Sequence, residues 1–430
     1  MSEIHLRSPR GWINDPNGFI YYQGKYHLFY QHFPYAPRWG RMHWGHAVSE
    51  DLTDWKHLEM ALFPSKPADC DGCFSGSAVE KDGRLWLFYT GVRYESPDPE
   101  NTNCCLNGEF VSSQLSLCSE DGETFDNFGG KRTVIPPIED PAIGDLRNTR
   151  DPKVWKESDG RYYMVLGSTA GEKGRLLFYR SDDLERWEYA NSVSAENYGW
   201  MWECPDYFRA GDAGVLLFSP MGTEYGNQAV CTFAEFSVGD ASMRMGKRFR
   251  FLDYGMDLYA PQSTVDAEGR RVVIAWLRMP EAPDGRRIGM FCIPRVCEAE
   301  NGHIYFRPHP NIRGKLSREI AAPNPAEQVF RLCTSLEENE ELCVGGYVIG
   351  RKNGRIFADR SAVVNGHTEV LGRSETPPLH DGFAVEAYVD RNIVEVFVND
   401  GEYVITHAVY GLTEEVRAEL RAGIHYFAAQ

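Results

Sequence analysis

The chain has 430 residues, of which 42% are hydrophobic and 25% charged, a composition typical of a globular protein with two domains. Its formal net charge of −17 argues against nucleic acid and anionic membranes as partners and leaves a neutral ligand open. No run is long and apolar enough to span a bilayer, and the opening MSEIHLRSPRGW lacks the apolar stretch of a secretory signal. The eleven cysteines are scattered without the spacing of a disulfide framework. Together these features predict a cytoplasmic protein with reduced thiols.

In chain order, one pattern repeats five times: a short polar turn followed by an apolar, aromatic-rich strand. The five strands are expected to begin near Tyr26, Leu85, Tyr162, Val215 and Val272. Their spacing fits one four-stranded sheet with its loops per repeat, which predicts the five blades of a β-propeller.

A second pattern, S-x-D-L-x-x-W, recurs at 49–55 and 181–187, with a looser copy at 119–125. Its Ser and Asp are expected to bond backbone amides of a turn, while the aromatic ring packs against the next sheet. Unrelated hairpins are the alternative, but copies in consecutive units favour a true repeat.

A polar, turn-rich segment precedes each of the five strands at nearly the same distance. The segments are Asn14-Asp15-Pro16, Phe74-Ser75-Gly76, Arg150-Asp151-Pro152, Glu203-Cys204-Pro205 and Tyr259-Ala-Pro-Gln262. Equivalent positions of propeller blades surround one axis, so these segments are expected to converge on one pocket. Three of the converging residues are acids, namely Asp15, Asp151 and Glu203.

The sequence pattern changes after Pro308, where the repeats end. Residues 1–310 are predicted to form the propeller, and 311–324 a polar linker. Alternating strands such as AVEAYVD and NIVEVFVNDG predict a β-sandwich over 325–430. The fold class expected is therefore all-β, a five-bladed β-propeller followed by a small C-terminal β-sandwich.

Two carboxylates flanking a sugar ring are the minimum for glycoside hydrolysis. At a separation of ~5–5.5 Å one attacks the anomeric carbon while the other protonates the leaving oxygen, whereas a wider gap admits water and gives inversion. Each acid alone would be interpreted as a turn or cap residue. Their recurrence at matched blade positions favours a catalytic site.

The local sequence suggests how the three acids differ. Donors near Asp15 and the fixed backbone of Pro16 suit a carboxylate that stays ionised. Apolar neighbours in WMWECP favour a protonated Glu203, as a general acid requires. The charge of Arg150 is expected to keep Asp151 ionised.

Aromatic residues near these segments fit a sugar pocket, namely Trp39, Trp44, Phe74, Tyr259 and Trp276. No metal is expected. The CxxC of Cys70 and Cys73 has no second pair at zinc spacing, and His43 and His46 fall on opposite faces of a strand.

Residues 8–310 resemble glycoside hydrolase family 32, which includes invertases, fructan hydrolases and sucrose-6-phosphate hydrolases. The motifs that carry the resemblance are WINDPNG at 12–18, FYQ at 29–31, HWGHAVSEDLTDW at 43–55, FSGSA at 74–78, RDPKVW at 150–155, WECPD at 202–206 and YAPQ at 259–262. The resemblance implies a five-bladed propeller joined to a β-sandwich, in agreement with the repeat pattern.

The resemblance also implies roles. Asp15 would be the nucleophile that forms a covalent fructosyl-enzyme at C2, Glu203 would protonate the leaving group and then activate water, and Asp151 would bind ring hydroxyls and stabilise the transition state. The positions implied to line the fructose subsite are Asn14, Gln31, Trp39, Phe74, Ser75 and Arg150. No metal or organic cofactor is implied.

Three features depart from the family pattern. Arg41 stands where an Asn is usual, and with Arg38 it could bind a phosphate on the leaving group or be a solvated surface charge. Segment 95–113 is longer and more polar than a hairpin needs and is expected to form a lid or rim. The sandwich is short for the family, which favours a role in packing or in a homodimer over carbohydrate binding.

The leading hypothesis is a cytoplasmic retaining β-fructofuranosidase that acts on sucrose, sucrose-6-phosphate or short fructo-oligosaccharides. Fructosyl transfer through the same intermediate is the close alternative. An inverting glycosidase acting on arabinosides and a catalytically silent sugar-binding propeller are the more distant ones.

Overall fold

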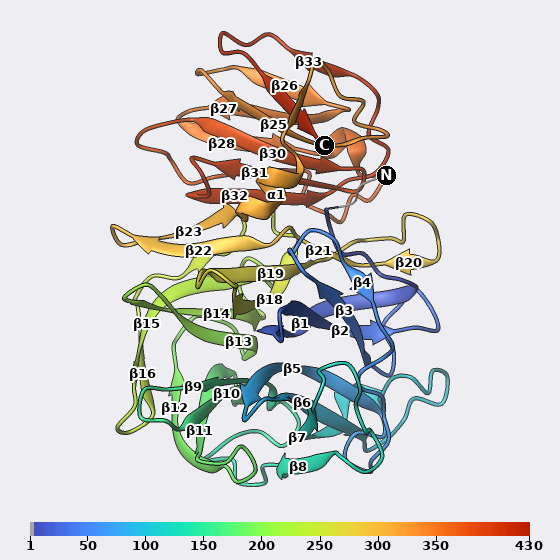
Figure 1. Ribbon diagram of the computed structural model, residues 1–430, viewed down its shortest axis with the longest axis vertical. Coiled ribbons are helices and arrows are strands. Elements are labelled where there is room, and N and C mark those ends of the chain that lie inside the picture. The colour runs from blue at the N-terminus through green and yellow to red at the C-terminus, as the bar shows by residue number, and fades with distance from the viewer. Residues whose placement is uncertain (1–3) are drawn as a thin grey trace.

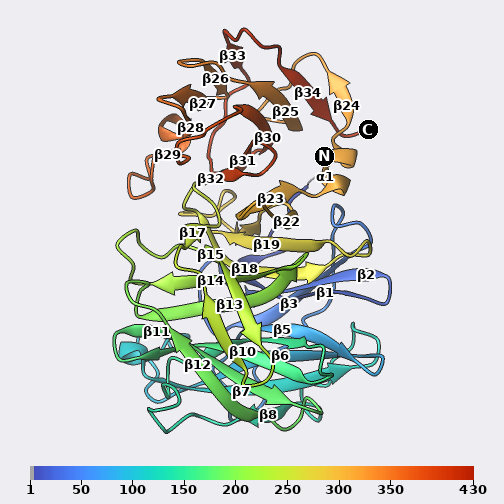
Figure 2. The ribbon, with the colours of Figure 1, turned by 90° about the vertical axis from the view of Figure 1, so that its left-hand side faces the viewer.

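The computed structural model describes residues 4–430 and consists almost entirely of β-strands (Figure 1). A propeller carries a smaller sandwich at one end, and the two views show the same stacking of the two parts (Figure 2). The one α-helix of the described residues, α1 (Pro310–Lys315), lies at the junction, and the short 3-10 turns are η1 (Leu106–Gly108) and η2 (Ser361–Val363).

Five antiparallel sheets form the blades of the propeller. Blade 1 has β1 (Gly11–Tyr22), β2 (Lys25–Phe33), β3 (His43–Ser49) and β4 (Lys56–His57), and blade 2 has β5 (Gly72–Lys81), β6 (Arg84–Tyr94), β7 (Phe110–Ser119) and β8 (Arg132–Ile135). Blade 3 has β9 (Arg150–Lys156), β10 (Tyr162–Ala170), β11 (Lys173–Ser181) and β12 (Glu188–Ser194). Blade 4 has β13 (Met201–Ala210), β14 (Ala213–Met221), β15 (Val230–Ser237), β16 (Ser242–Met245) and β17 (Arg250–Phe251). Blade 5 has β18 (Leu258–Val265), β19 (Arg271–Leu277), β21 (Met290–Phe291), β22 (Arg295–Glu300) and β23 (His303–Pro308).

The first strand of each blade lies innermost, because β1, β5, β9, β13 and β18 contact one another in a closed ring. Strand β20 (Arg287–Ile288), which follows the second strand of blade 5, pairs in parallel with β1 and so ties the last blade to the first. The five strands expected from the repeat are the second strands of the blades, β2, β6, β10, β14 and β19. The predicted five-bladed propeller is therefore confirmed.

A β-bulge interrupts each innermost strand at the same level. The register shifts lie between Ile13 and Pro16, Cys73 and Gly76, Arg150 and Lys153, Glu203 and Asp206, and Tyr259 and Gln262. A bulge re-aims side chains and releases a strand from strict alternation. The five polar segments singled out in the sequence are these bulges, which explains why they are rich in turn residues.

The S-x-D-L-x-x-W pattern forms the same tight turn in each copy. Ser49 Oγ accepts the backbone N–H of Leu52 at 2.9 Å, and Ser181 Oγ accepts that of Leu184 at 2.9 Å. Both leucines have positive φ, of 68° and 73°, and the looser copy places Gly122 there with φ 72°. A glycine adopts this conformation without strain, so its presence in the third copy fits the same turn.

The sandwich packs two sheets around one apolar core. The first sheet runs β24 (Arg318–Ile320), β34 (His425–Ala428), β25 (Val329–Ser335), β30 (Ala384–Asp390), β31 (Ile393–Val398) and β32 (Tyr403–Ala408). The second runs β29 (Arg373–Glu375), β28 (Arg355–Asp359), β27 (Tyr347–Lys352), β26 (Glu341–Val344) and β33 (Val416–Ala418). Segment 311–324, expected as a linker, holds most of α1 and all of β24, so the first sheet begins inside it.

Buried charges join the propeller to the sandwich. Arg295 of β22 lies 2.9 Å from Asp253 and 2.5 Å from Glu395 of β31, and all three side chains are almost fully buried. His5 contacts Asp390 at 2.7 Å and Glu395 at 2.8 Å. Since each charge has a partner of opposite sign from another segment, loss of one partner leaves the other charge buried and unpaired.

Arg295→Ala is expected to lower the free energy of unfolding by about 3–5 kcal/mol, because Asp253 and Glu395 would remain buried without their cation. Arg244→Ala is the control, since Arg244 and its partner Glu235 are 79% and 73% exposed. Thermal denaturation measures both variants. An Arg295→Ala protein that melts with the wild type would show that the joint between the two parts does not depend on this arginine.

Candidate active site

A cavity of about 560 Å³ opens where the five bulges meet. All nine residues assigned to the site from the sequence line it: Asn14, Asp15, Gln31, Trp39, Phe74, Ser75, Arg150, Asp151 and Glu203. Of the other aromatic residues expected there, Tyr259 and Trp276 also line the cavity. Trp44 does not. It is fully buried in the blade and donates from Nε1 to the backbone oxygen of Phe74 at 2.9 Å.

Asp15 is held at both carboxylate oxygens. Ser75 Oγ donates to Oδ2 at 2.6 Å, and Asn14 Nδ2 donates to Oδ1 at 3.1 Å. Trp12 in turn holds Asn14 through Nε1 at 2.8 Å, and Gln31 donates to Ser75 Oγ at 3.2 Å. The donors expected from the sequence are present, but burial outweighs them and raises the pKa of Asp15 above its ordinary value.

Asp151 lies in the bulge of β9 with φ 65°, a conformation uncommon for residues other than glycine. Its Oδ2 accepts the backbone N–H of Cys204 at 2.9 Å. Burial is the largest effect and raises the pKa of Asp151 to about 7, with repulsion from Glu203 and Asp15 adding to it. The expectation that Arg150 keeps Asp151 ionised is not met, because that attraction is smaller than the cost of burial.

Glu203 lies in a polar setting rather than the apolar one expected from WMWECP. Arg150 donates to Oε1 from Nη2 at 2.8 Å and from Nε at 3.1 Å, and Tyr259 donates to Oε2 at 2.7 Å. Strand alternation sends the neighbouring Trp202 into a core between blades, where it is fully buried. Trp202 therefore packs away from the carboxylate, although Trp200 of the same segment lines the cavity.

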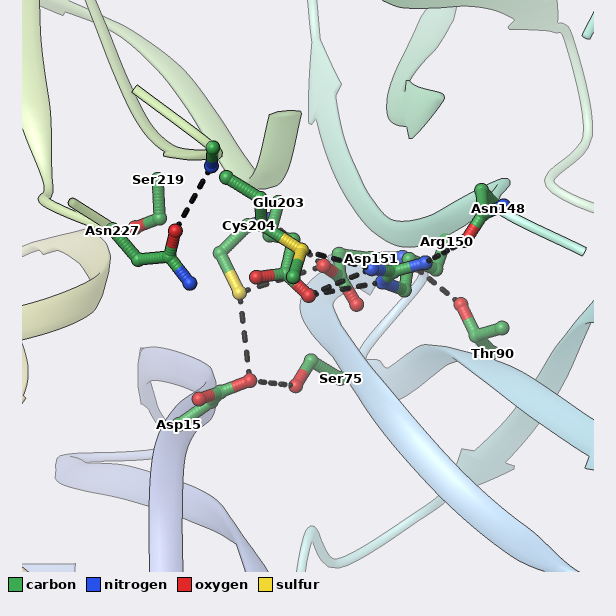
Figure 3. A network of polar contacts seen from close by, with 12 residues as sticks. Asp15, Ser75, Thr90, Asn148, Arg150, Asp151, Glu203, Cys204, Ser219 and Asn227 are labelled. Atoms are coloured by element: carbon green, nitrogen blue, oxygen red, sulfur yellow. Dashed lines mark hydrogen bonds and ion pairs between the residues drawn. The ribbon is translucent and has the colours of Figure 1, made fainter. Parts of the chain in front are cut away.

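The Cys204 thiol connects two of the acids (Figure 3). Its sulfur lies 3.5 Å from Oδ2 of Asp15 and 3.5 Å from Oδ2 of Asp151. Burial, followed by repulsion from the nearby acids, raises the pKa of this thiol well above its ordinary value, so it stays protonated. No role was predicted for Cys204 from the sequence, although its position next to Glu203 in one of the five polar segments indicated that it lies near the acids.

Aromatic side chains form two walls of the pocket. On one side the ring of Phe74 lies 5.9 Å from Trp39 and 5.9 Å from Phe110. On the other, Trp12 and Trp276 are 5.7 Å apart. A sugar presents C–H faces and hydroxyl groups. The aromatic rings match the C–H faces, and the three carboxylates and the arginine match the hydroxyl groups.

Segment 95–113 forms one rim of the pocket, as expected from its length, through Cys105, Asn107 and Gly108 together with Phe110. Another rim residue, Tyr94, is anchored: its backbone N–H donates to Asp71 at 2.8 Å, and its hydroxyl donates to the Asn103 oxygen at 2.8 Å.

Arg41 braces this rim. Its Nη2 lies 2.9 Å from Asp71 Oδ1, and its guanidinium lies 5.9 Å from the centre of the Tyr94 ring. Neither Arg38 nor Arg41 is among the residues that line the pocket. Arg38 is exposed, as expected of a surface charge, whereas Arg41 is half-buried and paired with Asp71, a structural role that neither interpretation included.

Two family models match the chain along nearly its whole length. The Glycosyl hydrolases family 32 N-terminal domain covers residues 5–308, and the family 32 C-terminal domain covers 304–429. The chain belongs to glycoside hydrolase family 32. It is therefore a glycoside hydrolase, as the converging carboxylates indicate.

Relatives and solved structures agree with this assignment. The chain is 35% identical to a sucrose-6-phosphate hydrolase of Escherichia coli and 34% identical to a raffinose invertase of the same species. Each alignment covers 97% of this chain and 91% of the relative. A Bombyx mori GH32 beta-fructofuranosidase superposes with a TM-score of 0.84 at 28% identity, over 100% of this chain and 94% of that one. A sucrose-6-phosphate hydrolase of Lactobacillus gasseri has the same fold, with a TM-score of 0.87 at 24% identity over 100% and 93% of the two chains.

No helix among the described residues is long and apolar enough to cross a membrane.

Asp151→Asn is expected to stabilise the fold at pH 8 and to leave it nearly unchanged at pH 4. The pKa of Asp151 is raised from 3.8 to about 7, so the wild type loses stability as the pH rises through this range. The amide can still accept the Cys204 N–H but carries no charge, and the gain at pH 8 is on the order of a few kcal/mol. Thermal denaturation at both pH values measures it, with the exposed Asp212→Asn as control. An equal effect at both pH values would contradict the assigned pKa.

Proposed function

We propose that the protein is a retaining β-fructofuranosidase that removes a terminal fructosyl unit from sucrose and short fructo-oligosaccharides. The observation that carries the proposal is the convergence of Asp15, Asp151 and Glu203 on one aromatic-walled pocket, each held by specific donors. The names of the relatives support the substrate class, since they include a raffinose invertase and sucrose-6-phosphate hydrolases.

In the first step Asp15 attacks C2 of the fructosyl unit and the bond from C2 to the leaving oxygen breaks. Glu203 gives its proton to that oxygen, so the leaving sugar departs as a neutral alcohol. Ser75 and Asn14 fix the attacking carboxylate, and burial leaves it poorly solvated, which favours attack.

In the second step a water molecule attacks C2 and the bond to Asp15 breaks. Glu203, now a carboxylate, takes the proton of the water, which restores both acids to their starting states. Arg150 and Tyr259 hold the two oxygens of Glu203, so they position one group for both proton transfers. Two inversions at C2 give net retention.

Asp151 acts on the sugar in both steps. Substrate binding brings hydroxyl donors to its carboxylate, and these favour the ionised form that burial opposes in the free enzyme. A carboxylate at this place stabilises the positive charge that develops at C2 and the ring oxygen. Cys204 keeps it oriented through its backbone N–H.

The pocket favours an uncharged leaving group. Among the described residues that line it, Arg150 is the one arginine or lysine, and its guanidinium is bound to Glu203. A phosphate on the leaving sugar would thus find no unpaired cation in the pocket wall. We therefore place sucrose ahead of sucrose-6-phosphate as substrate.

Wild-type protein is expected to release fructose from sucrose and 1-kestose, and Asp15→Asn to reduce kcat by at least about a thousandfold because no covalent bond to C2 can form. Fructose release is measured for these sugars, sucrose-6-phosphate and a chromogenic arabinoside, with Asp140→Asn, an exposed acid, as control. Proton NMR identifies the first anomer formed, which should be the β-furanose. Release of the α-anomer, or activity on the arabinoside alone, would overturn the proposal, and kestose formed from sucrose would show transfer.

Arg41→Asn is expected to change kcat/KM for sucrose and for sucrose-6-phosphate by the same factor, since Arg41 braces the rim through Asp71 rather than facing the pocket. Arg38→Asn, an exposed neighbour, is the matched control and should alter neither. A loss confined to the phosphorylated sugar would instead assign phosphate binding to Arg41.

A further inference from the structure

A second cleft of about 680 Å³ lies on blade 4 and is larger than the catalytic pocket. Five aromatic side chains line its wall, namely Tyr198, Tyr225, Phe249, Phe251 and Tyr254, together with the amides of Asn197 and Gln228. None of them lines the catalytic pocket. The reaction described above makes no use of this cleft.

The end of β14 separates the two cavities. Met221 lines the catalytic pocket and contacts Arg150, while Ser219 accepts the backbone N–H of Ala260 and the Tyr259 hydroxyl. Pro220, between them, lines the second cleft. Because alternate residues of a strand face opposite sides, one strand end forms a wall of both cavities.

The rings in the cleft form two groups of contacts. Tyr198 and Phe249 have ring centres 3.8 Å apart, while Phe251 contacts Tyr225 on one side and Tyr254 on the other, each at 5.6 Å and close to edge-on. Tyr225 is 62% exposed at the tip of the loop that follows β14. An exposed tyrosine ring at the mouth of an aromatic cleft offers an electron-rich face to the C–H groups of a ligand.

Gln228 supplies an unused polar group in this wall. Its side chain is nine-tenths buried, and Oε1 accepts a hydrogen bond from Arg278 at 3.3 Å. Among the described residues its Nε2 has no acceptor, although it lines the cleft. Nε2 is not among the buried polar atoms that lack a partner, so it is accessible from the cleft, where a ligand hydroxyl would accept its hydrogen bond.

Charged side chains of both signs line the cleft, Glu196 and Glu224 together with Lys247 and Arg250, so the wall offers both acceptors and donors to the hydroxyl groups of a ligand. Aromatic faces with an amide donor and carboxylate acceptors match a neutral molecule that has C–H faces and many hydroxyl groups. We propose that this cleft is a second saccharide-binding site, separate from the catalytic pocket. The proposal does not depend on the catalytic mechanism.

The site is tested by fluorine NMR on full-length Asp15→Asn protein labelled with 3-fluorotyrosine and titrated with 1-kestose. Tyr225 reports on the cleft and Tyr259 on the catalytic pocket, and the loss of each resonance in Tyr225→Phe and Tyr259→Phe assigns them. Both resonances are expected to shift and saturate, with different dissociation constants. Gln228→Ala should raise the dissociation constant read at Tyr225 by about fivefold. The dissociation constant read at Tyr259 should stay unchanged, while its starting resonance is expected to move because Arg278, the partner of Gln228, lies over the Tyr259 ring.

A Tyr259 shift without any Tyr225 shift would overturn the second site and leave the catalytic proposal intact. A Tyr225 shift that follows the Tyr259 curve and ignores Gln228→Ala would also overturn it, as an indirect effect through β14. Failure of the wild type to hydrolyse any tested fructoside would contradict the proposed function alone. In the active enzyme, Tyr225→Ala should leave kcat for sucrose within twofold of the wild type, as should Phe128→Ala, whose ring is 70% exposed elsewhere.

Discussion

The site depends on three acidic side chains gathered around a single guanidinium, that of Arg150. Burial raises the pKa of Asp15 and of Asp151. The guanidinium of Arg150 is bound to Glu203. A fold that keeps this charge away from water is less stable at neutral pH than one without it. The same burial strengthens every attraction that develops when a sugar cation forms between the acids. The cost to stability and the capacity for catalysis thus have one cause.

The propeller makes this arrangement possible because it closes a ring of strands that would otherwise lie far apart. Each innermost strand carries a bulge at the same level, and three of the bulges hold a non-glycine residue in the left-handed conformation, at Asp151, Cys204 and Ala260. Such conformations persist only where the surroundings fix them. The neighbouring innermost strands, which contact one another in a closed ring, provide that support.

Much of this could be predicted from sequence because the repeat is visible in it. The polar segments before each apolar strand placed Asp15, Asp151 and Glu203 on one axis without any contact being known. The environments of the acids could not be predicted, since neighbours in a strand point to opposite faces. The apolar side chain of Trp202 therefore does not indicate the environment of the Glu203 carboxylate. Arg150 bonds to Glu203 in the next blade rather than to the adjacent Asp151. The partner of Arg41 could not be predicted for a different reason, because Asp71 is distant in sequence.

The central claim is that Asp15 bonds covalently to C2, and trapping that bond tests it most directly. Glu203→Gln protein is mixed with β-D-fructofuranosyl fluoride, whose leaving group needs no acid, and quenched within milliseconds for intact and peptide mass spectrometry. The account predicts an adduct of one fructosyl unit, located on the peptide that contains Asp15 and absent in the Asp15→Asn, Glu203→Gln double variant. Steady release of fructose without any adduct, or an adduct on Asp151, would contradict it.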